Sequence, residues 1–170
     1  MLRRRRGADR YSTMDTLERG QIRRAIADDA PALAALRYDF RAASRPAIES
    51  REEFVPRFLQ WIRPRLASNA PWRVWVLEYG GSVVGNVWLQ LVDKLPNPNA
   101  RRELHGYITN FFLRPEHRNG GAGSRLLEAV LEECKRSNVD AVFLWPTERS
   151  RPFYERHGFK PPSDMLAREV

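Results

Sequence analysis

A glycine-rich turn at residues 118–124 has the composition of an anion-binding site. Glycines let the backbone approach ligand oxygens closely. An amphipathic segment with helical spacing follows at once, and the first N–H groups of a helix have no partners within the helix. The helix dipole adds about half a positive charge at that end. The turn therefore predicts a site for phosphate groups. Its candidate ligand-binding residues are Arg118, Asn119, Gly120, Gly121, Ala122, Gly123 and Ser124.

The turn differs from two common nucleotide-binding motifs. It lacks the Lys-Ser/Thr ending of a Walker loop, and it lacks the G-x-G-x-x-G spacing of a dinucleotide fold. Both differences argue against those ligands. A plain glycine-rich turn without a ligand remains the alternative to an anion site.

The elements that must position this turn indicate an α/β fold. A strand at 106–113 precedes the turn, and a helix at 123–136 and a strand at 139–144 follow it, which makes one βαβ unit. Gly80-Gly81 between two Val- and Trp-rich runs predicts a hairpin. We therefore expect a mixed central sheet, antiparallel in its first half and parallel in its second, flanked by helices. The other expected elements are a strand at 22–26, a helix at 29–42 capped by Asp28 or Asp29, a helix capped by Ser50, strands at 72–79 and 82–91, a helix at 149–157 and a last strand or hairpin before residue 170.

Length and charge set the broad class. The 170 residues suggest one domain at 21–170 after a flexible basic tail at 1–20, where six arginines stand against three acids. No apolar run approaches the ~20 residues that span a bilayer. The net charge of +8 is compatible with a polyanionic ligand such as coenzyme A, with nucleic acid, or with a solvated surface that has no specific partner. No nucleic-acid-binding motif accompanies the charge. The sequence has one cysteine, Cys134, which is expected on the apolar face of the 123–136 helix. A single cysteine cannot form an internal disulfide or, alone, a cysteine-based metal site. This cysteine content favours a reducing, cytoplasmic location.

Two motifs together resemble the GNAT family, the GCN5-related N-acetyltransferases. Residues 118–123 are similar to the family's R-x-x-G-x-G/A motif, and residues 153–159 are similar to its FYxxxGF signature. The motifs stand in the family's order, with one helix and one strand between them. The resemblance covers residues 21–165 and implies an acetyltransferase that uses acetyl-coenzyme A (acetyl-CoA) as cosubstrate.

The resemblance also implies how the cosubstrate binds. The N–H groups of 119–124 would hold the pyrophosphate, and Arg118 would orient the loop or contact a phosphate. The main chain of Phe112, Leu113 and Arg114 would pair with pantetheine, admitted where the strands of Leu113 and Phe143 splay apart. Ser150 is included in this site, although alanine is frequent there in the family, as is asparagine at the position of Thr147.

Tyr154 would be the general acid near the sulfur. A phenol with a pKa of about 10 stays protonated at neutral pH and can protonate a leaving thiolate whose pKa is about 8.5. Glu103, His105 and Asp93 are candidate bases, and exposed loop charges without a catalytic role are the alternative reading for each. His157 is expected to interact with the C-terminal end of its own helix.

The acceptor site is expected from residues 43–66 and 92–105, with Trp61, Trp72 and Trp88 either lining it or packing in the core. Tyr107 and Asn110 could both face the acceptor only if a bulge interrupts their strand, because three residues of regular strand put them on opposite faces.

The sequence thus predicts transfer of an acetyl group from acetyl-CoA directly to a primary amine, on a small molecule or a peptide. A non-catalytic acyl-CoA-binding sensor is the alternative. Neither a metal nor a membrane partner is expected, nucleic acid is disfavoured, and a homodimer is compatible with the sequence.

Overall fold

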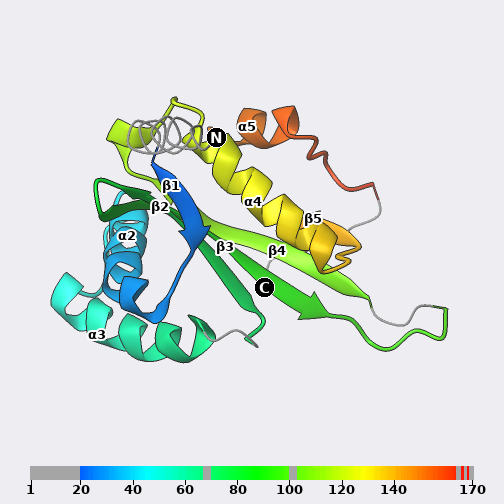
Figure 1. Ribbon diagram of the computed structural model, residues 1–170, viewed down its shortest axis with the longest axis horizontal. Coiled ribbons are helices and arrows are strands. Elements are labelled where there is room, and N and C mark those ends of the chain that lie inside the picture. Colours follow the sequence, from blue (N-terminus) through cyan, green and yellow to red (C-terminus); the bar gives the residue numbers. More distant parts are fainter. Residues whose placement is uncertain (1–19, 67–69, 100–102, 164–165, 167, 169–170) are drawn as a thin grey trace, which may run out of the picture.

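A five-stranded mixed sheet forms the centre of the molecule (Figure 1). The computed structural model describes residues 20–66, 70–99, 103–163, 166 and 168. The sheet order follows the chain, and every neighbouring pair is antiparallel except the last, which is parallel. This arrangement confirms the expected mixed sheet. The strands are β1 (Gln21–Arg24), β2 (Trp72–Tyr79), β3 (Ser82–Asp93), β4 (Leu104–Leu113) and β5 (Ala141–Phe143).

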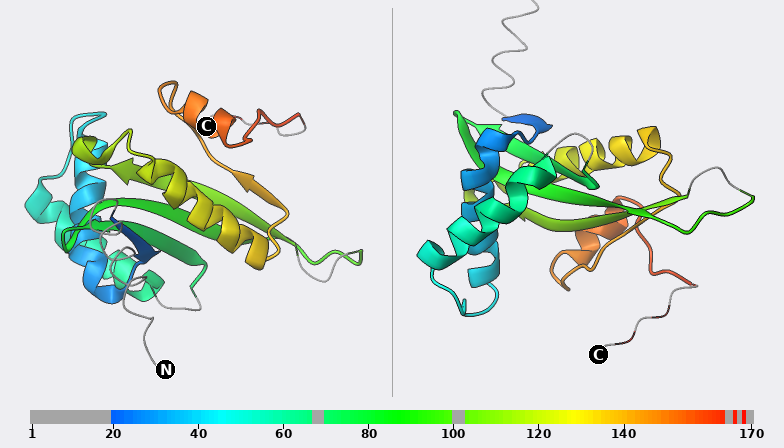
Figure 2. Two further views of the ribbon diagram at one scale, coloured as in Figure 1. Left: turned by 45° about the horizontal axis from the view of Figure 1, so that its top comes forward. Right: turned by 90° about the horizontal axis from the view of Figure 1, so that it is seen from below.

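Helices cover both faces of the sheet (Figures 1 and 2). Helix α4 lies across one face, and α2 and α3 lie on the other, while α5 stands beside the first turn of α4. The α-helices are α2 (Ala30–Ala42), α3 (Arg51–Ile62), α4 (Ala122–Arg136) and α5 (Arg151–Arg156). Short 3-10 turns are η1 (Ala27–Asp29), η2 (Arg63–Leu66) and η3 (Pro115–His117).

Local signals explain where several elements begin. The Ser50 hydroxyl accepts the N–H of Glu53, and the Glu53 carboxylate accepts the N–H of Ser50, so α3 starts at the predicted capping box. Gly80 and Gly81 both have positive φ, at 57° and 76°, which suits the tight turn between β2 and β3.

Two apolar clusters hold the layers together. Leu126, Leu127 and Val130 of α4 pack against the sheet, where Leu89 and Ile108 are also buried. On the other face, the second cluster centres on residues of α2, α3 and the first strands. Its buried members are Ala25, Ala30, Leu33, Ile62, Val74, Val76 and Trp88.

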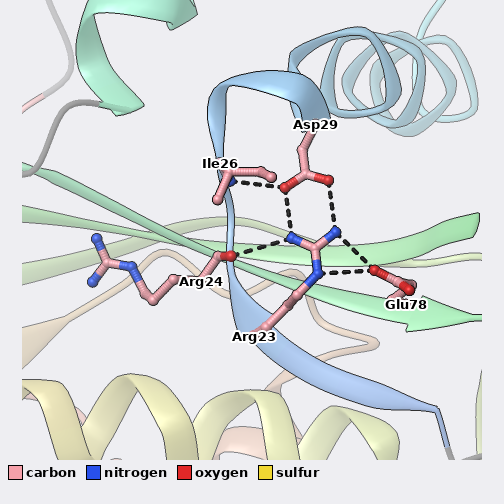
Figure 3. A network of polar contacts seen from close by, with 5 residues as sticks. All are labelled: Arg23, Arg24, Ile26, Asp29 and Glu78. Atoms are coloured by element: carbon pink, nitrogen blue, oxygen red, sulfur yellow. Dashed lines mark hydrogen bonds and ion pairs between the residues drawn. The ribbon is translucent and has the colours of Figure 1, made fainter. Parts of the chain in front are cut away.

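An ion-paired network joins β1 to the start of α2 (Figure 3). Both Asp29 carboxylate oxygens accept from the Arg23 guanidinium, at 2.7 and 2.8 Å, and one also accepts the N–H of Ile26 at 2.8 Å. Arg23 Nε also donates to Glu78 of β2 at 2.8 Å. The predicted Asp29 cap of α2 is therefore corrected, because this carboxylate makes no capping bond to α2 and closes the preceding turn instead.

The C-terminal part differs from expectation. The described residues after α5, which are 157–163, 166 and 168, contain no strand. The expected final strand or hairpin is therefore absent from the part of it that can be described. Strand β5 is shorter than the predicted 139–144, and 1–19 of the expected tail lies outside the described residues.

Candidate active site

The glycine-rich turn leads directly into α4. Asn119 and Gly121 take left-handed backbone conformations, with φ of 64° and 78°, and α4 begins at Ala122. A side chain at Gly120 or Gly121 would meet nothing within 4 Å of its Cβ. The predicted turn therefore exists as an open loop at the N-terminus of a fifteen-residue helix.

Arg118 is fixed by its own loop. Its Nε donates to the carbonyl oxygen of Leu113 at 2.9 Å, and its guanidinium carbon lies 5.6 Å from the centre of the Phe112 ring. Of the two roles considered for Arg118, these contacts favour orientation of the loop.

Strands β4 and β5 pair over only three residues. His105, Gly106 and Tyr107 face Ala141, Val142 and Phe143. Beyond Tyr107, β4 continues to Leu113 while β5 has ended. One edge of β4, including Phe112 and Leu113, is therefore left without a partner strand, as the predicted separation of the strands requires.

Arg114 stands at the end of this edge. Its N–H donates to the carbonyl of Val84 at 2.9 Å, and its side chain lies 3.8 Å from the Asp39 carboxylate of α2. The Arg114 carbonyl oxygen accepts the N–H of His117 at 3.0 Å, so both main-chain polar groups of Arg114 already have partners within the protein.

Tyr154 lies on α5 among aromatic rings. It is 9% exposed, and the Phe111 and Phe159 rings lie 6.3 and 5.7 Å from its own. Its hydroxyl makes no hydrogen bond within the described part of the chain. Burial raises the pKa of Tyr154 to about 12. The phenol therefore keeps its proton throughout the neutral range.

Two contacts hold α5 against the glycine-rich turn. The Phe153 ring packs over Gly123, where an added Cβ would lie 3.6 Å from the ring. His157 Nε2 lies 3.0 Å from Ser124 Oγ, and its Nδ1 lies 2.7 Å from the Phe153 carbonyl oxygen. The contact with its own helix was expected, whereas the contact with Ser124 was not. Together these contacts hold the helix that bears Tyr154 against the turn.

Ser150 shapes the approach to α5. Its Oγ accepts the N–H of Thr147 at 2.9 Å and lies 3.0 Å from the Thr147 hydroxyl. The Ser150 hydroxyl is thus engaged within this turn, directly before α5.

The candidate bases lie far from Tyr154. Glu103 pairs with Lys94 at 2.9 Å, and the hydrogen bond from Lys94 is the main reason that the pKa of Glu103 is lowered. The His105 ring lies 6.3 Å from the Phe143 ring. His105 precedes Phe111, which touches Tyr154, by six strand residues, or about 20 Å at 3.4 Å per residue. The structure therefore brings neither Glu103 nor His105 next to Tyr154, and Asp93, paired with Leu104, lies at the same distant end of the sheet.

A bulge in β4 places Tyr107 and Asn110 on one face. Asn86 of β3 faces Phe112, whereas Trp88 faces Thr109, so β4 contains one extra residue there. Asn110 has a φ of 48°. Its Oδ1 accepts from Arg37 Nη1 of α2 at 3.1 Å, and Arg37 also interacts electrostatically with Tyr107. The bulge that the sequence left open is present.

Two residues near this face, Arg37 and Trp145, were not predicted as site residues, and Phe143 was expected only to mark the separation of the strands. Tyr107 stacks on Phe143 with a centroid distance of 5.3 Å, and Trp145 stands nearly perpendicular to both rings. The side chain of Trp145 is 66% exposed. Short aromatic runs such as 143–145 carry no sequence signal that separates a surface platform from core.

The tryptophans that were considered for the acceptor site belong to another cluster. Trp88 is 2% exposed, and Trp61, Trp72 and Trp88 lie 5.7–6.1 Å from one another between α3 and the sheet. Trp88 is therefore a core residue, whereas Trp61, which is 37% exposed, lies at the edge of this aromatic cluster. Among the residues that can be described, no group of acidic, histidine or cysteine side chains could hold a metal ion, and no helix has the length and apolar character needed to cross a bilayer.

Comparisons with known proteins identify the family. The model of the Acetyltransferase (GNAT) family matches residues 33–159. An uncharacterized N-acetyltransferase of Archaeoglobus fulgidus is 26% identical over 150 residues, which cover 84% of this chain and 94% of that protein. The crystal structure of a GCN5-related N-acetyltransferase from Ralstonia eutropha has a TM-score of 0.69 and 27% identity, and covers 88% of this chain and 97% of that one. A predicted acetyltransferase from Clostridium acetobutylicum, solved with acetyl-CoA, shares the fold with a TM-score of 0.72 and 22% identity over 88% of this chain and 95% of its own. The chain therefore belongs to the Acetyltransferase (GNAT) family.

Proposed function

We propose that this protein transfers the acetyl group of acetyl-CoA directly to a primary amine. The observation that carries the proposal is the position of Tyr154, which α5 holds beside the 118–124 turn and the unpartnered edge of β4. A cosubstrate that filled this edge would have its phosphates at the turn and its reactive end near Tyr154.

The turn would bind the pyrophosphate through the main-chain N–H groups of residues 119–124. The open backbone at Gly120 and Gly121 leaves room for phosphate oxygens. The pantetheine arm would lie along β4 past Leu113. Because pairing with β5 stops at Tyr107, polar main-chain groups of β4 are left for the arm to bond.

The chemistry needs one proton removed and one supplied. The neutral amine attacks the thioester carbonyl, which gives a tetrahedral intermediate with a negatively charged oxygen. When that intermediate collapses, the C–S bond breaks and coenzyme A leaves as a thiolate, which takes a proton from the Tyr154 hydroxyl. The nitrogen loses its extra proton to water or to a base. Cys134 is not required, since no covalent enzyme intermediate forms.

The base that takes the proton from the amine has several candidates. Glu103 and His105 could act only through a chain of several water molecules, because His105 lies about 20 Å along β4 from the residue that contacts Tyr154 and Glu103 precedes β4. Tyr107 lies nearer, at the point where the strands separate.

The test is release of free thiol from acetyl-CoA in the presence of a panel of primary amines, run beside calorimetric binding of acetyl-CoA. We expect binding, and thiol release that depends on the amine. Propionyl-CoA in place of acetyl-CoA measures the preference for acyl length. Binding without turnover by any amine would favour the acyl-CoA sensor instead, and a failure to bind would refute both.

A further inference from the structure

Arg37 is a half-buried cation without an acidic partner among the residues that the structure describes. Its Nη1 donates to Asn110, which is a neutral acceptor. Burial lowers the pKa of the Arg37 guanidinium, and the positive charge of Arg41 lowers it further. Other arginines in this protein meet carboxylates, as Arg23 meets Asp29 and Arg57 meets Glu49. A desolvated charge without a counter-ion is costly, so an anion supplied by a ligand would be strongly favoured beside Arg37.

The guanidinium is held in place by a chain of hydrogen bonds. Asn110 accepts from Arg37 through Oδ1, and its Nδ2 donates to Asn86 at 3.0 Å. Asn86 Oδ1 also accepts from Trp88 Nε1 at 2.6 Å. Since Asn86, Trp88 and Asn110 are all buried, the amide that holds Arg37 has little freedom to turn away. Arg37 is thus anchored to β4 by its hydrogen bond to a buried and well-held amide.

An aromatic platform lies next to this cation. Tyr107 interacts with Arg37 and stacks on Phe143, and both rings meet Trp145 at centroid distances of 5.1 and 5.5 Å. Two-thirds of the Trp145 side chain is exposed. The platform stands where β4 and β5 separate, since Tyr107 and Phe143 are the last pair between them. The cation and the apolar surface therefore both lie near the point where the pairing of β4 and β5 ends.

On the basis of the proposed acetyl transfer, we propose that the acceptor is an amine that also carries a carboxylate and an apolar or aromatic group, as an aromatic α-amino acid does. The carboxylate would bind the Arg37 guanidinium, and the apolar group would lie on Tyr107, Phe143 and Trp145. These two contacts would direct the amine toward the unpartnered edge of β4, where the thioester is proposed to lie. An amine of positive charge alone would be repelled by Arg37.

The test compares acceptors that differ only in the carboxylate. L-phenylalanine and 2-phenylethylamine share the amine and the ring, and tryptophan and tryptamine make a second pair. Initial rates are measured on the full chain at matched concentrations of neutral amine. We expect kcat/KM to be at least about tenfold higher for the carboxylate-bearing member of each pair, as a charge-assisted bond provides. The substitution Arg37→Gln should lower kcat/KM for phenylalanine at least tenfold more than it lowers kcat/KM for phenylethylamine.

Controls separate recognition from folding. Arg41→Gln removes the same charge from an exposed site one helical turn away, and should keep the preference. Arg37→Lys keeps the positive charge but loses the paired N–H donors of the guanidinium, so it should retain part of the preference for the carboxylate. Unchanged melting temperature and acetyl-CoA affinity in Arg37→Gln would show that the fold and cosubstrate site are intact. If Arg37→Gln does not fold, the Arg37→Lys variant and the wild-type preference decide.

The outcomes are distinct. An equal or reversed preference in the wild type, or a preference that survives in Arg37→Gln, overturns the carboxylate inference and leaves acetyl transfer standing. Absence of thiol release with every amine contradicts the proposed function instead. In that case, stabilisation of the coenzyme A-bound protein by N-acetyl-L-phenylalanine, lost in Arg37→Gln, would still support the inference, and equal stabilisation or none would refute it.

Discussion

His157 Nε2 lies 3.0 Å from the Oγ of Ser124, and this contact joins the end of α5 to the first turn of α4. Nδ1 of the same ring lies 2.7 Å from the carbonyl oxygen of Phe153, which can only accept. Nδ1 must therefore carry a proton, and in the neutral ring Nε2 accepts from the Ser124 hydroxyl. The helix that bears Tyr154 and the helix behind the glycine-rich turn thus share one hydrogen bond.

Removing this contact should loosen the site. We expect His157→Ala to lower the free energy of unfolding by about 1–2 kcal/mol, since two hydrogen bonds are lost, and to raise KM for acetyl-CoA. A double-mutant cycle with Ser124→Ala, followed by urea unfolding, isolates the pair, and Arg156→Ala is the exposed control on the same helix. Additive effects of the two substitutions would mean that the contact contributes nothing.

Tyr154→Phe should lower kcat by about 10²-fold while the affinity for coenzyme A changes less than about twofold, because only a proton donor is lost. The melting temperature should stay the same or rise, since the Tyr154 hydroxyl has no hydrogen-bond partner among the described residues. Pre-steady-state rates and calorimetry measure the two quantities. Full activity in the variant would remove Tyr154 from the acid role.

The pH dependence gives a second check on the same residue. Because the pKa of Tyr154 is raised to about 12 in the folded protein, its proton is retained well above its usual range. The associated stabilisation is complete below about pH 10 and is lost as pH rises toward 12. We therefore expect no loss of kcat below about pH 11 that Tyr154 causes. A decrease of kcat near pH 9 that shifts when Tyr154 is replaced would contradict the raised pKa of this phenol.

Gly121 should be sensitive for two separable reasons. Its φ of 78° makes Gly121→Ala cost about 1 kcal/mol of stability, whereas Gly120→Ala should cost less because Gly120 does not have a positive φ. Gly121→Asp should weaken coenzyme A binding at least about tenfold through repulsion of phosphate. Gly121→Asn, of equal size and tolerant of this conformation, is its uncharged control. Equal affinities of the Asp and Asn variants would place the phosphates elsewhere.

Asp29 should stabilise the fold in a pH-dependent way. Its hydrogen bond from Arg23 is the main reason that the pKa of Asp29 lies below its usual value. The stabilisation is therefore present above about pH 4 and disappears as pH falls through the lowered pKa. We expect Asp29→Asn to cost about 2 kcal/mol at pH 7 and less near pH 3, with the exposed Asp28→Asn as control. A cost that does not depend on pH would show that charge is not responsible.

The parts of the candidate site that could be predicted are those formed by residues close together in the sequence. The turn at 118–124 and the signature at 153–159 each depend on neighbours in sequence, as does the capping box of Ser50 and Glu53. Such features arise from backbone conformation and local hydrogen bonds, which a few residues determine. These segments carried the family resemblance, which the family match over residues 33–159 confirms.

The unpredicted parts depend on contacts between distant segments. Arg37 and Asn110 are 73 residues apart, and His157 and Ser124 are 33 apart, so their meeting depends on sheet order and helix placement. The distance of Glu103 and His105 from Tyr154 could not be predicted for a related reason. Their closeness to β4 in sequence said nothing about which end of that strand meets α5.

The bulge at Asn110 makes the length of β4 as important as its composition. Ile108 and Phe111 both pack on the α4 face, although three residues of regular strand would put them on opposite faces. Deleting one residue there would restore regular alternation and turn the segment from Phe111 to Leu113 over. Phe111 and Leu113 would then leave the apolar core, and Phe112 would leave Arg118. A substitution at this point would change single contacts, whereas deletion of one residue would move the side chains from Phe111 to Leu113 to the opposite faces of the sheet.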